Sequence, residues 1–276
     1  MADSKQLVKE LREITGAGIL DCKKYLDRAN NNIEEAIKLI RSEAGLKADK
    51  KGSRIAAEGI VNFYEDEEFS LILELNSETD FVARDNNFIS LASFIADKLL
   101  KNDISNVKED IDNEISSVIS KLGENIQLRR YKKITKDNFV FGYSHNNKIS
   151  SLVELKNNDN LLAKDICMQI VASNPLSLDE ASLDSETLKS EKEIYKKELE
   201  KLDKKEDIKR NILDGKMKKF VSENTLLNQP FVKDPSTSLS KIIKDNEIIS
   251  FVRYEVGEGI EKKTEDFAKE VYNQIS

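Results

Sequence analysis

Apolar residues recur at three- and four-residue intervals through the first 43 positions, which is the spacing of amphipathic helices. They form a first run at 7–14, a glycine-containing break at 15–18 and a second run at 20–26. A third helix is expected after Asn32, because Glu35 three residues later completes a capping-box pattern. The pattern therefore predicts a bundle of three short helices.

The rest of the chain contains an internal repeat. Shifting the sequence by 80 residues places 73–75 on 153–155 and 80–85 on 160–165. In each copy two strand-like runs precede a helix. The strand pairs are expected at 59–64 with 69–76 and at 138–143 with 149–156, the helices at 86–101 and 161–174, and the closing strands at 128–131 and 251–254. The repeat predicts two similar α+β halves.

The second copy is longer than the first. Between 182 and 234, apolar residues at near-heptad intervals among Glu and Lys predict an inserted helical hairpin with coiled-coil character. We expect a three-helix domain at 1–43, a linker at 44–54, a first core subdomain at 55–136, a second at 137–181 with 235–260, the hairpin with its return segment at 182–234, and a C-terminal helix at 261–276.

Composition narrows the classes of function. Lys and Arg number 44 against 51 Asp and Glu, and the net charge of −7 disfavours sequence-independent binding to nucleic acid. The single histidine, His145, leaves no second imidazole for a His-rich metal site, and no glycine-rich phosphate-binding motif occurs. An enzyme would therefore have to work with carboxylates, lysines or thiols, and we expect the chain to hold no metal, nucleotide or other cofactor.

Cysteine usage and hydropathy indicate the compartment. Cys22 and Cys167 are too few for a disulfide framework and lack the Cys-x-x-Cys spacing of zinc or redox sites. The sequence has no signal-peptide pattern and no run of about 18 apolar residues. We expect a cytoplasmic protein without membrane contact, with both cysteines buried as small apolar residues.

Five segments follow one another in a fixed order along the chain. They are LREITGAGILDCKK at 11–24, RIAAEG at 54–59, NSETDFVAR at 76–84, QPFVKD at 229–234 and FVRYEVGEGIEK at 251–262. In order and spacing these segments resemble the elongation factor Ts family. The resemblance implies an α+β protein with a ubiquitin-associated-like N-terminal bundle, two core halves with antiparallel sheets, an inserted coiled coil and a C-terminal helix. It also implies guanine nucleotide exchange on elongation factor Tu, by a protein that is not an enzyme.

The same resemblance implies which residues contact elongation factor Tu. The segment Thr79, Asp80, Phe81 and Val82 matches the family segment that dislodges magnesium and disturbs the phosphate site of the partner. It lies where a predicted strand stops before a helix starts, so a rigid sheet would support an exposed aromatic ring. The other implied contacts are Arg12, Ile19, Leu20, Lys23, His145, Val232 and Lys233.

Several of these residues have a structural explanation as well. Asp80 also suits a helix cap, and Phe81 suits a staple between the first turn and the core. The equivalent residues of the second copy, Asn160 and Leu161, suit both tasks equally, so an acidic and aromatic pair in one copy favours a special role there. Leu20 has the spacing of a bundle-core residue. His145, Val232 and Lys233 also fit ordinary turns.

The chain departs from the family pattern in three places. Ile19 and Leu20 replace a common methionine pair, Asn146 stands where glycine is usual, and the hairpin is shorter than in some relatives. Two other function classes stay open at this point. One is an adaptor that binds through the bundle and the hairpin, and the other is a hydrolase that uses paired carboxylates such as Glu58 and Glu74.

Overall fold

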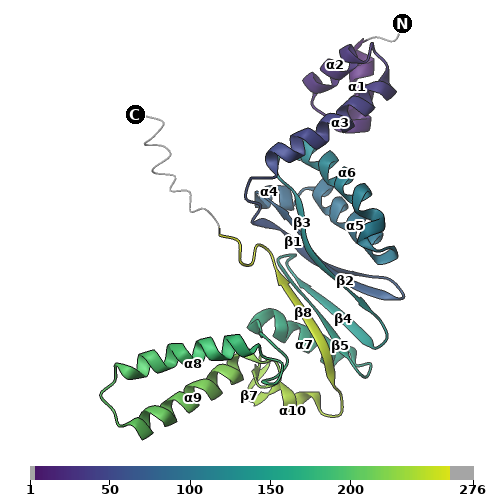
Figure 1. Ribbon diagram of the computed structural model, residues 1–276. Helices are drawn as coiled ribbons and strands as arrows, with labels where there is room; N and C mark the ends of the chain where they lie inside the picture. The colour runs from purple at the N-terminus through teal and green to yellow at the C-terminus, as the bar shows by residue number, and fades with distance from the viewer. Residues whose placement is uncertain (1–3, 262–276) are drawn as a thin grey trace. The chain divides into compact units, whose positions relative to one another are not determined.

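The computed structural model describes residues 4–261, apart from the side chains of 41, 42 and 44–50. Helices and antiparallel strands make the fold α+β, as predicted (Figure 1). The described residues divide into two compact units, of which the first holds 4–64, 73–133 and 255–261 and the second holds 65–72 and 134–254. No helix in this part of the chain is both long and apolar enough to cross a bilayer. The predicted C-terminal helix lies outside the described residues, except for its first position.

The first unit starts with the predicted helices α1 (Ser4–Thr15), α2 (Ile19–Arg28) and α3 (Ile33–Lys51). Their buried core consists of Leu11, Cys22, Tyr25, Leu26, Ala29 and Ala36. Asn32 caps α3 as expected, because its Oδ1 accepts a hydrogen bond from the Glu35 N–H at 3.1 Å.

The third helix continues further than the sequence pattern predicted. It runs through Lys51 and so occupies most of the stretch at 44–54 that we expected to be a linker. Alanine, leucine and lysine predominate in the helical part at 44–51, and their helix propensity outweighs the cost of Gly45 there, which is about 1 kcal/mol. The helix α3 therefore covers most of the stretch between the bundle and the first sheet.

A carboxylate of α3 joins this helix to α2 within the bundle. Glu43 accepts a hydrogen bond from the Tyr25 hydroxyl at 2.8 Å and forms an ion pair with Arg28. Burial and this hydrogen bond raise the pKa of Tyr25 to about 12. The phenol therefore stays protonated, and donates to Glu43, throughout the neutral range.

The first sheet has the order β1-β2-β3 and consists of β1 (Glu58–Glu65), β2 (Phe69–Ser77) and β3 (Gln127–Thr135). Three helices lie between β2 and β3, namely α4 (Asp80–Ala83), α5 (Asn86–Lys101) and α6 (Ile104–Leu122). In the first unit α5 and α6 pack against each other, and α5 buries Phe88, Leu91 and Ile95 (Figure 1). The strands β1 and β2 and the helix α5 lie where the repeat predicted them.

The second sheet has the order β4-β5-β8 and consists of β4 (Phe139–His145), β5 (Ile149–Leu155) and β8 (Ile248–Glu255). The strands β4 and β5 form an antiparallel pair in which Phe141 lies opposite Val153. The helix α7 (Asn160–Ser173) packs on both strands. Its buried residues Ala163, Ile166, Cys167 and Ile170 form the centre of this unit's core. Both cysteines of the chain are buried, as expected.

Two helices occupy the predicted insertion, α8 (Ser185–Glu200) and α9 (Glu206–Asn224), and they lie side by side (Figure 1). Lys216 on α9 joins them, because its Nζ lies 2.5 Å from a Glu198 carboxylate oxygen and 4.9 Å from the centre of the Tyr195 ring. The short elements β6 (Pro230–Phe231), β7 (Asp234–Ser238) and α10 (Leu239–Ile243) then lead to β8.

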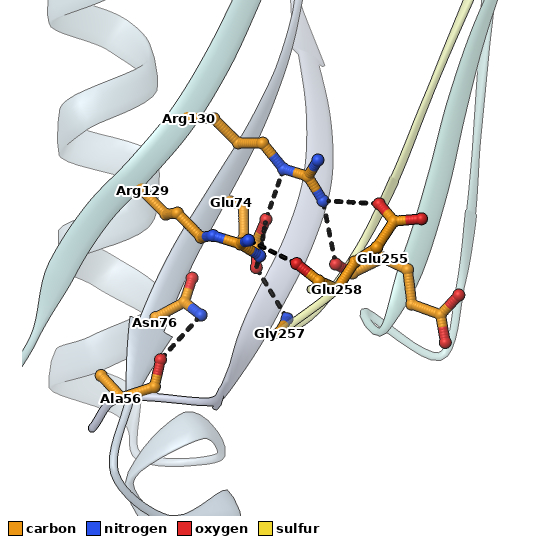
Figure 2. Close-up of polar contacts among 8 residues, drawn as sticks. All are labelled: Ala56, Glu74, Asn76, Arg129, Arg130, Glu255, Gly257 and Glu258. Atoms are coloured by element: carbon orange, nitrogen blue, oxygen red, sulfur yellow. Dashed lines mark hydrogen bonds and ion pairs between the residues drawn. The ribbon is translucent and has the colours of Figure 1, made fainter. Parts of the chain in front are cut away.

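A buried carboxylate fastens the residues that follow β8 to the first sheet. Glu74 on β2 is fully buried, and Figure 2 shows its carboxylate between two arginines and a backbone amide. Arg129 Nη1 donates to it at 3.0 Å, Arg130 Nε at 2.6 Å and the Gly257 N–H at 2.8 Å. Arg130 also forms an ion pair with Glu258 at 3.0 Å. Since a buried charge is tolerated only when it is paired and hydrogen-bonded, these contacts form an interdependent network.

The network also explains the glycine at 257 and the charge of Arg130. Gly257 has φ +72°, and a Cβ there would lie 2.3 Å from the Ala57 carbonyl oxygen, so a side chain does not fit. Burial lowers the pKa of Arg130, but hydrogen bonds to Glu258 and Glu74 outweigh that effect, and the net result is a raised pKa. With both carboxylate oxygens occupied by donors, Glu74 acts as a structural anchor, and the hydrolase hypothesis that named it was wrong for this residue.

Replacing Glu74 by alanine is expected to destabilise the first unit. The change leaves two guanidinium groups without their buried partner, which costs about 3 kcal/mol, at the lower end of the range for a broken buried pair because both arginines are partly solvated. Urea unfolding should show a lower midpoint, and hydrogen exchange should be faster at the Gly257 amide.

The matched control is Asp97→Ala, which removes a carboxylate from the exposed Asp97–Lys101 pair of the same unit. Its effect on the free energy of unfolding should stay within about 0.5 kcal/mol. Equal midpoints for the two variants, with unchanged exchange at Gly257, would contradict the structural role of Glu74.

Candidate partner-binding site

The segment 77–85 joins β2 to α5 and contains the one-turn helix α4. Thr79 caps α4, since its Oγ1 accepts a hydrogen bond from the Val82 N–H at 3.4 Å. Asp85 caps α5 by accepting from the Asn87 N–H at 2.7 Å. Both helix starts therefore have caps of their own, and the hypothesis that Asp80 serves as a cap was wrong.

Phe81 extends into solvent from the second position of α4. Its side chain is 80% exposed, whereas Ala83 at the end of the same turn is 4% exposed. The hypothesis that the ring staples the turn to the core was therefore wrong as well. Leaving a phenylalanine exposed forgoes about 2–3 kcal/mol of burial free energy within the chain. That free energy remains available to a partner that covers the ring.

Asp80 lies next to the exposed ring and carries an ion pair on its own helix. Arg84 Nη2 approaches the Asp80 carboxylate at 2.8 Å, with side-chain exposures of 40% for Asp80 and 78% for Arg84. Ion pairs this exposed contribute about 0–1 kcal/mol. The carboxylate can therefore exchange Arg84 for another cation at little cost.

Two glutamates outside α4 hold the backbone of the segment in place. Glu124 accepts from the Thr79 N–H at 2.9 Å and from the Thr79 hydroxyl at 2.6 Å. Glu78 accepts from the Asn125 N–H at 2.6 Å and forms an ion pair with Arg54 at 3.5 Å. The hydrogen bonds of Glu124 and Glu78 join residues 45 and 47 positions apart, and the ion pair of Glu78 with Arg54 spans 24 positions, so no local sequence pattern predicts them.

The repeat-equivalent turn in the second unit has the same construction. Asp159 caps α7 by accepting from the Leu162 N–H at 3.0 Å, and Leu161 at the second helical position is 79% exposed. Capping by Asn160 and packing by Leu161, as the sequence suggested, were both wrong. Exposure alone therefore does not distinguish Phe81 from its counterpart Leu161. The difference between the two turns is the acidic and aromatic pair, Asp80 and Phe81, in the first one.

The N-terminal bundle brings together three of the predicted contacts. Arg12, Ile19 and Lys23 line a shallow groove of about 610 Å³ between α1 and α2. The complete lining is Ser4, Lys5, Val8, Lys9, Arg12, Ile19 and Lys23, so four basic side chains and two apolar side chains share the groove. This combination suits an acidic protein surface with an apolar centre.

Leu20 lies beside this groove on α2 without lining it. Its side chain is 83% exposed, and that of Ile19 is 57% exposed. The bundle core is formed instead by Cys22, Tyr25 and Leu26 of the same helix. The hypothesis that Leu20 belongs to the core was therefore wrong, and α2 presents two adjacent apolar side chains to solvent.

The predicted contacts of the second unit fall in two places. His145 is exposed at the β4–β5 turn, where its described partners are Tyr143 at 3.1 Å and Asn146 at 3.4 Å. Asn146 has φ +51°, in the left-handed region, which explains why a turn that favours glycine accepts asparagine here.

Val232 and Lys233 follow β6 and are attached to α7. The Val232 N–H donates to Gln169 Oε1 at 2.7 Å, and Lys233 Nζ lies 2.5 Å from an Asp165 carboxylate oxygen. The Val232 side chain remains 46% exposed. The backbone of this turn is thus held from inside while an apolar side chain points outward.

Comparison with known proteins gives a consistent result. A family model described as Elongation factor TS matches residues 78–258. Elongation factor Ts of Legionella pneumophila (strain Paris) is 42% identical over 287 residues, which cover 99% of this chain and 98% of that protein. Elongation factor Ts of a Nitratiruptor species is 44% identical over 308 residues, with 100% of both chains covered. The chain belongs to the elongation factor Ts family and is a translation elongation factor.

Proposed function

We propose that this chain is a guanine nucleotide exchange factor that binds elongation factor Tu in its GDP-bound state and promotes GDP release. The observation that carries the proposal is the exposed Phe81 ring beside Asp80, on a turn held by side-chain hydrogen bonds. Membership of the elongation factor Ts family supports elongation factor Tu as the proposed partner. The proposed activity is binding, with no covalent step and no cofactor of its own.

An exchange factor works through differential affinity. It must bind the nucleotide-poor state of its partner more tightly than the GDP-bound state. Speeding release by about 10³ to 10⁵ requires about 4–7 kcal/mol of preferential stabilisation. Burial of the Phe81 ring contributes about 2–3 kcal/mol of this. The remainder has to come from other contacts, which gives the bundle and the second unit a role.

Asp80 supplies the electrostatic part of the proposed mechanism. A carboxylate placed beside a bound magnesium ion and phosphates competes for the metal and repels the phosphates. Its present partner, Arg84, is mostly exposed, so exchanging that ion pair for a magnesium contact costs little. In this proposal Thr79 to Val82 enter the partner as one segment, with Phe81 opening the site and Asp80 loosening the metal.

The other predicted contacts contribute affinity in this proposal. The groove with Arg12, Ile19 and Lys23, together with exposed Leu20, forms one surface of the bundle that fits an acidic and apolar patch of elongation factor Tu. In the second unit His145 and Val232 with Lys233 offer further contacts. Contacts of this kind act equally on both nucleotide states, so they lower the concentration needed and leave the maximal release rate unchanged.

Replacing Phe81 by alanine is expected to slow catalysed GDP release by about 30- to 150-fold, the factor that corresponds to about 2–3 kcal/mol. The measurement is the release of fluorescent GDP from elongation factor Tu at saturating concentrations of each variant. The thermal unfolding midpoint should stay the same, because the ring makes little contact with its own chain.

Leu161→Ala is the matched control for this experiment. Leu161 occupies the same helical position in the repeat and has almost the same exposure, 79% against 80%. It should leave the maximal release rate unchanged. An unchanged rate for Phe81→Ala would remove the ring from the mechanism, and no acceleration by the wild-type chain would overturn the proposed function.

Replacing Leu20 by alanine should change affinity instead of maximal rate. Truncating a leucine that becomes buried in an interface costs about 1.5–3 kcal/mol, so the half-saturating concentration should rise by about 10- to 150-fold. Titration of the chain in the same release assay measures both quantities. Ile89→Ala removes an exposed apolar side chain of α5 and serves as the control. A lower maximal rate for Leu20→Ala, at constant half-saturation, would contradict the division of roles.

A further inference from the structure

We propose that Glu124 is a positioning residue for nucleotide exchange and fixes the direction in which Phe81 points. This inference rests on the proposed function, because it assigns Glu124 an effect that passes through the Phe81 ring. Glu124 is far from the exposed ring along the chain and follows α6, whereas Phe81 follows β2. The link between them is Thr79.

Every polar group of Thr79 takes part in a hydrogen bond. Its N–H and hydroxyl both donate to Glu124, at 2.9 and 2.6 Å. Its carbonyl accepts from the Ser77 hydroxyl at 2.9 Å and from the Ala83 N–H at 3.3 Å, and its Oγ1 accepts from the Val82 N–H at 3.4 Å. One carboxylate therefore holds the backbone and the side chain of the residue that starts α4.

The helix α4 cannot fix its own orientation. It is a single turn of four residues, far below the length of about 12 at which isolated helices become even marginally stable in water. The Phe81 ring does not help, since it is 80% exposed and adds little packing. The buried Ala83 anchors the far end of the turn, and the Thr79–Glu124 contact anchors its start.

Glu124 is itself held in a defined place. The preceding Gly123 ends α6 in the left-handed region at φ +83°, with its N–H donating to the Ile119 carbonyl at 2.9 Å. The following Asn125 donates its N–H to Glu78 at 2.6 Å. Residues 78 and 79 thus exchange hydrogen bonds with residues 125 and 124, so the turn is clamped from both sides.

The physical consequence is preorganisation. Without the clamp, α4 would sample several orientations, and the partner would have to order the segment on binding. The free-energy cost of ordering the segment is then paid in the step in which the ring enters the nucleotide site. The contacts that the bundle makes with the partner do not change. Loss of Glu124 therefore reduces the maximal release rate and leaves the half-saturating concentration nearly unchanged.

The test is a double-mutant cycle in the GDP-release assay with Glu124→Ala and Phe81→Ala in the full chain. Glu124→Ala alone should lower the maximal rate by about tenfold, the lower end of what a hydrogen bond to a charged acceptor contributes. In the Phe81→Ala background the same change should alter the rate by less than about twofold. The half-saturating concentration should move by less than about twofold in both backgrounds.

Two further variants keep the test decisive. Glu124→Gln keeps the shape and one acceptor oxygen, so it replaces the alanine variant in the cycle if that variant unfolds. Asp112→Asn removes an exposed carboxylate of α6, paired with Lys108, and should leave the maximal rate unchanged.

The outcomes separate the two proposals. An equal loss from the Glu124 change with and without the Phe81 ring means that Glu124 acts elsewhere, which overturns the positioning role. A loss for Phe81→Ala with none for Glu124→Ala overturns the positioning role alone. No loss for Phe81→Ala overturns the assigned role of the ring, and the positioning role with it.

Discussion

The contact between Glu124 and Thr79 is the constraint on which the candidate site depends. A short turn that keeps an aromatic ring in solvent cannot be held by the ring, so its hydrogen bonds must hold it. Both donors of Thr79 end on one carboxylate, while Ala83 is buried at the other end of α4. The hydrogen bonds between Thr79 and Glu124 thereby offset the free-energy cost of leaving the Phe81 ring exposed. The result is a rigid support with an apolar group at its tip, which is the combination that an exchange factor needs.

The same principle recurs elsewhere in the chain. Glu74 fastens residues 255–258 by accepting from two arginines and a backbone amide, and Gln169 fastens the turn at Val232. In each case a buried polar side chain holds a backbone segment. These hydrogen bonds are directional, so they fix the orientation of each backbone segment as well as stabilise it. A protein that acts only by presenting surfaces to a partner gains from this kind of construction.

Much of the fold followed from the sequence because its signals are local. Strand periodicity located β1, β2, β4 and β5, the repeat located α5 and α7, and the capping pattern located the start of α3. The candidate segment at 79–82 came from a family resemblance. Its supports did not, because the hydrogen bonds of Glu124 with Thr79 and of Glu78 with Asn125 span 45 and 47 residues. The sequence did not show whether Leu20 lies in the bundle core or on the surface. Helical spacing identifies an apolar face of a helix but does not show what covers that face.

In the mechanism that we propose, the Phe81 ring moves from solvent into the nucleotide-binding domain of elongation factor Tu. A fluorinated phenylalanine placed at position 81 tests it directly, because its ¹⁹F resonance reports the surroundings of that one ring among the 11 phenylalanines. We expect a solvent-exposed resonance in the free chain and a large shift when the complex forms. An unchanged resonance in a stable complex that still releases GDP would contradict it.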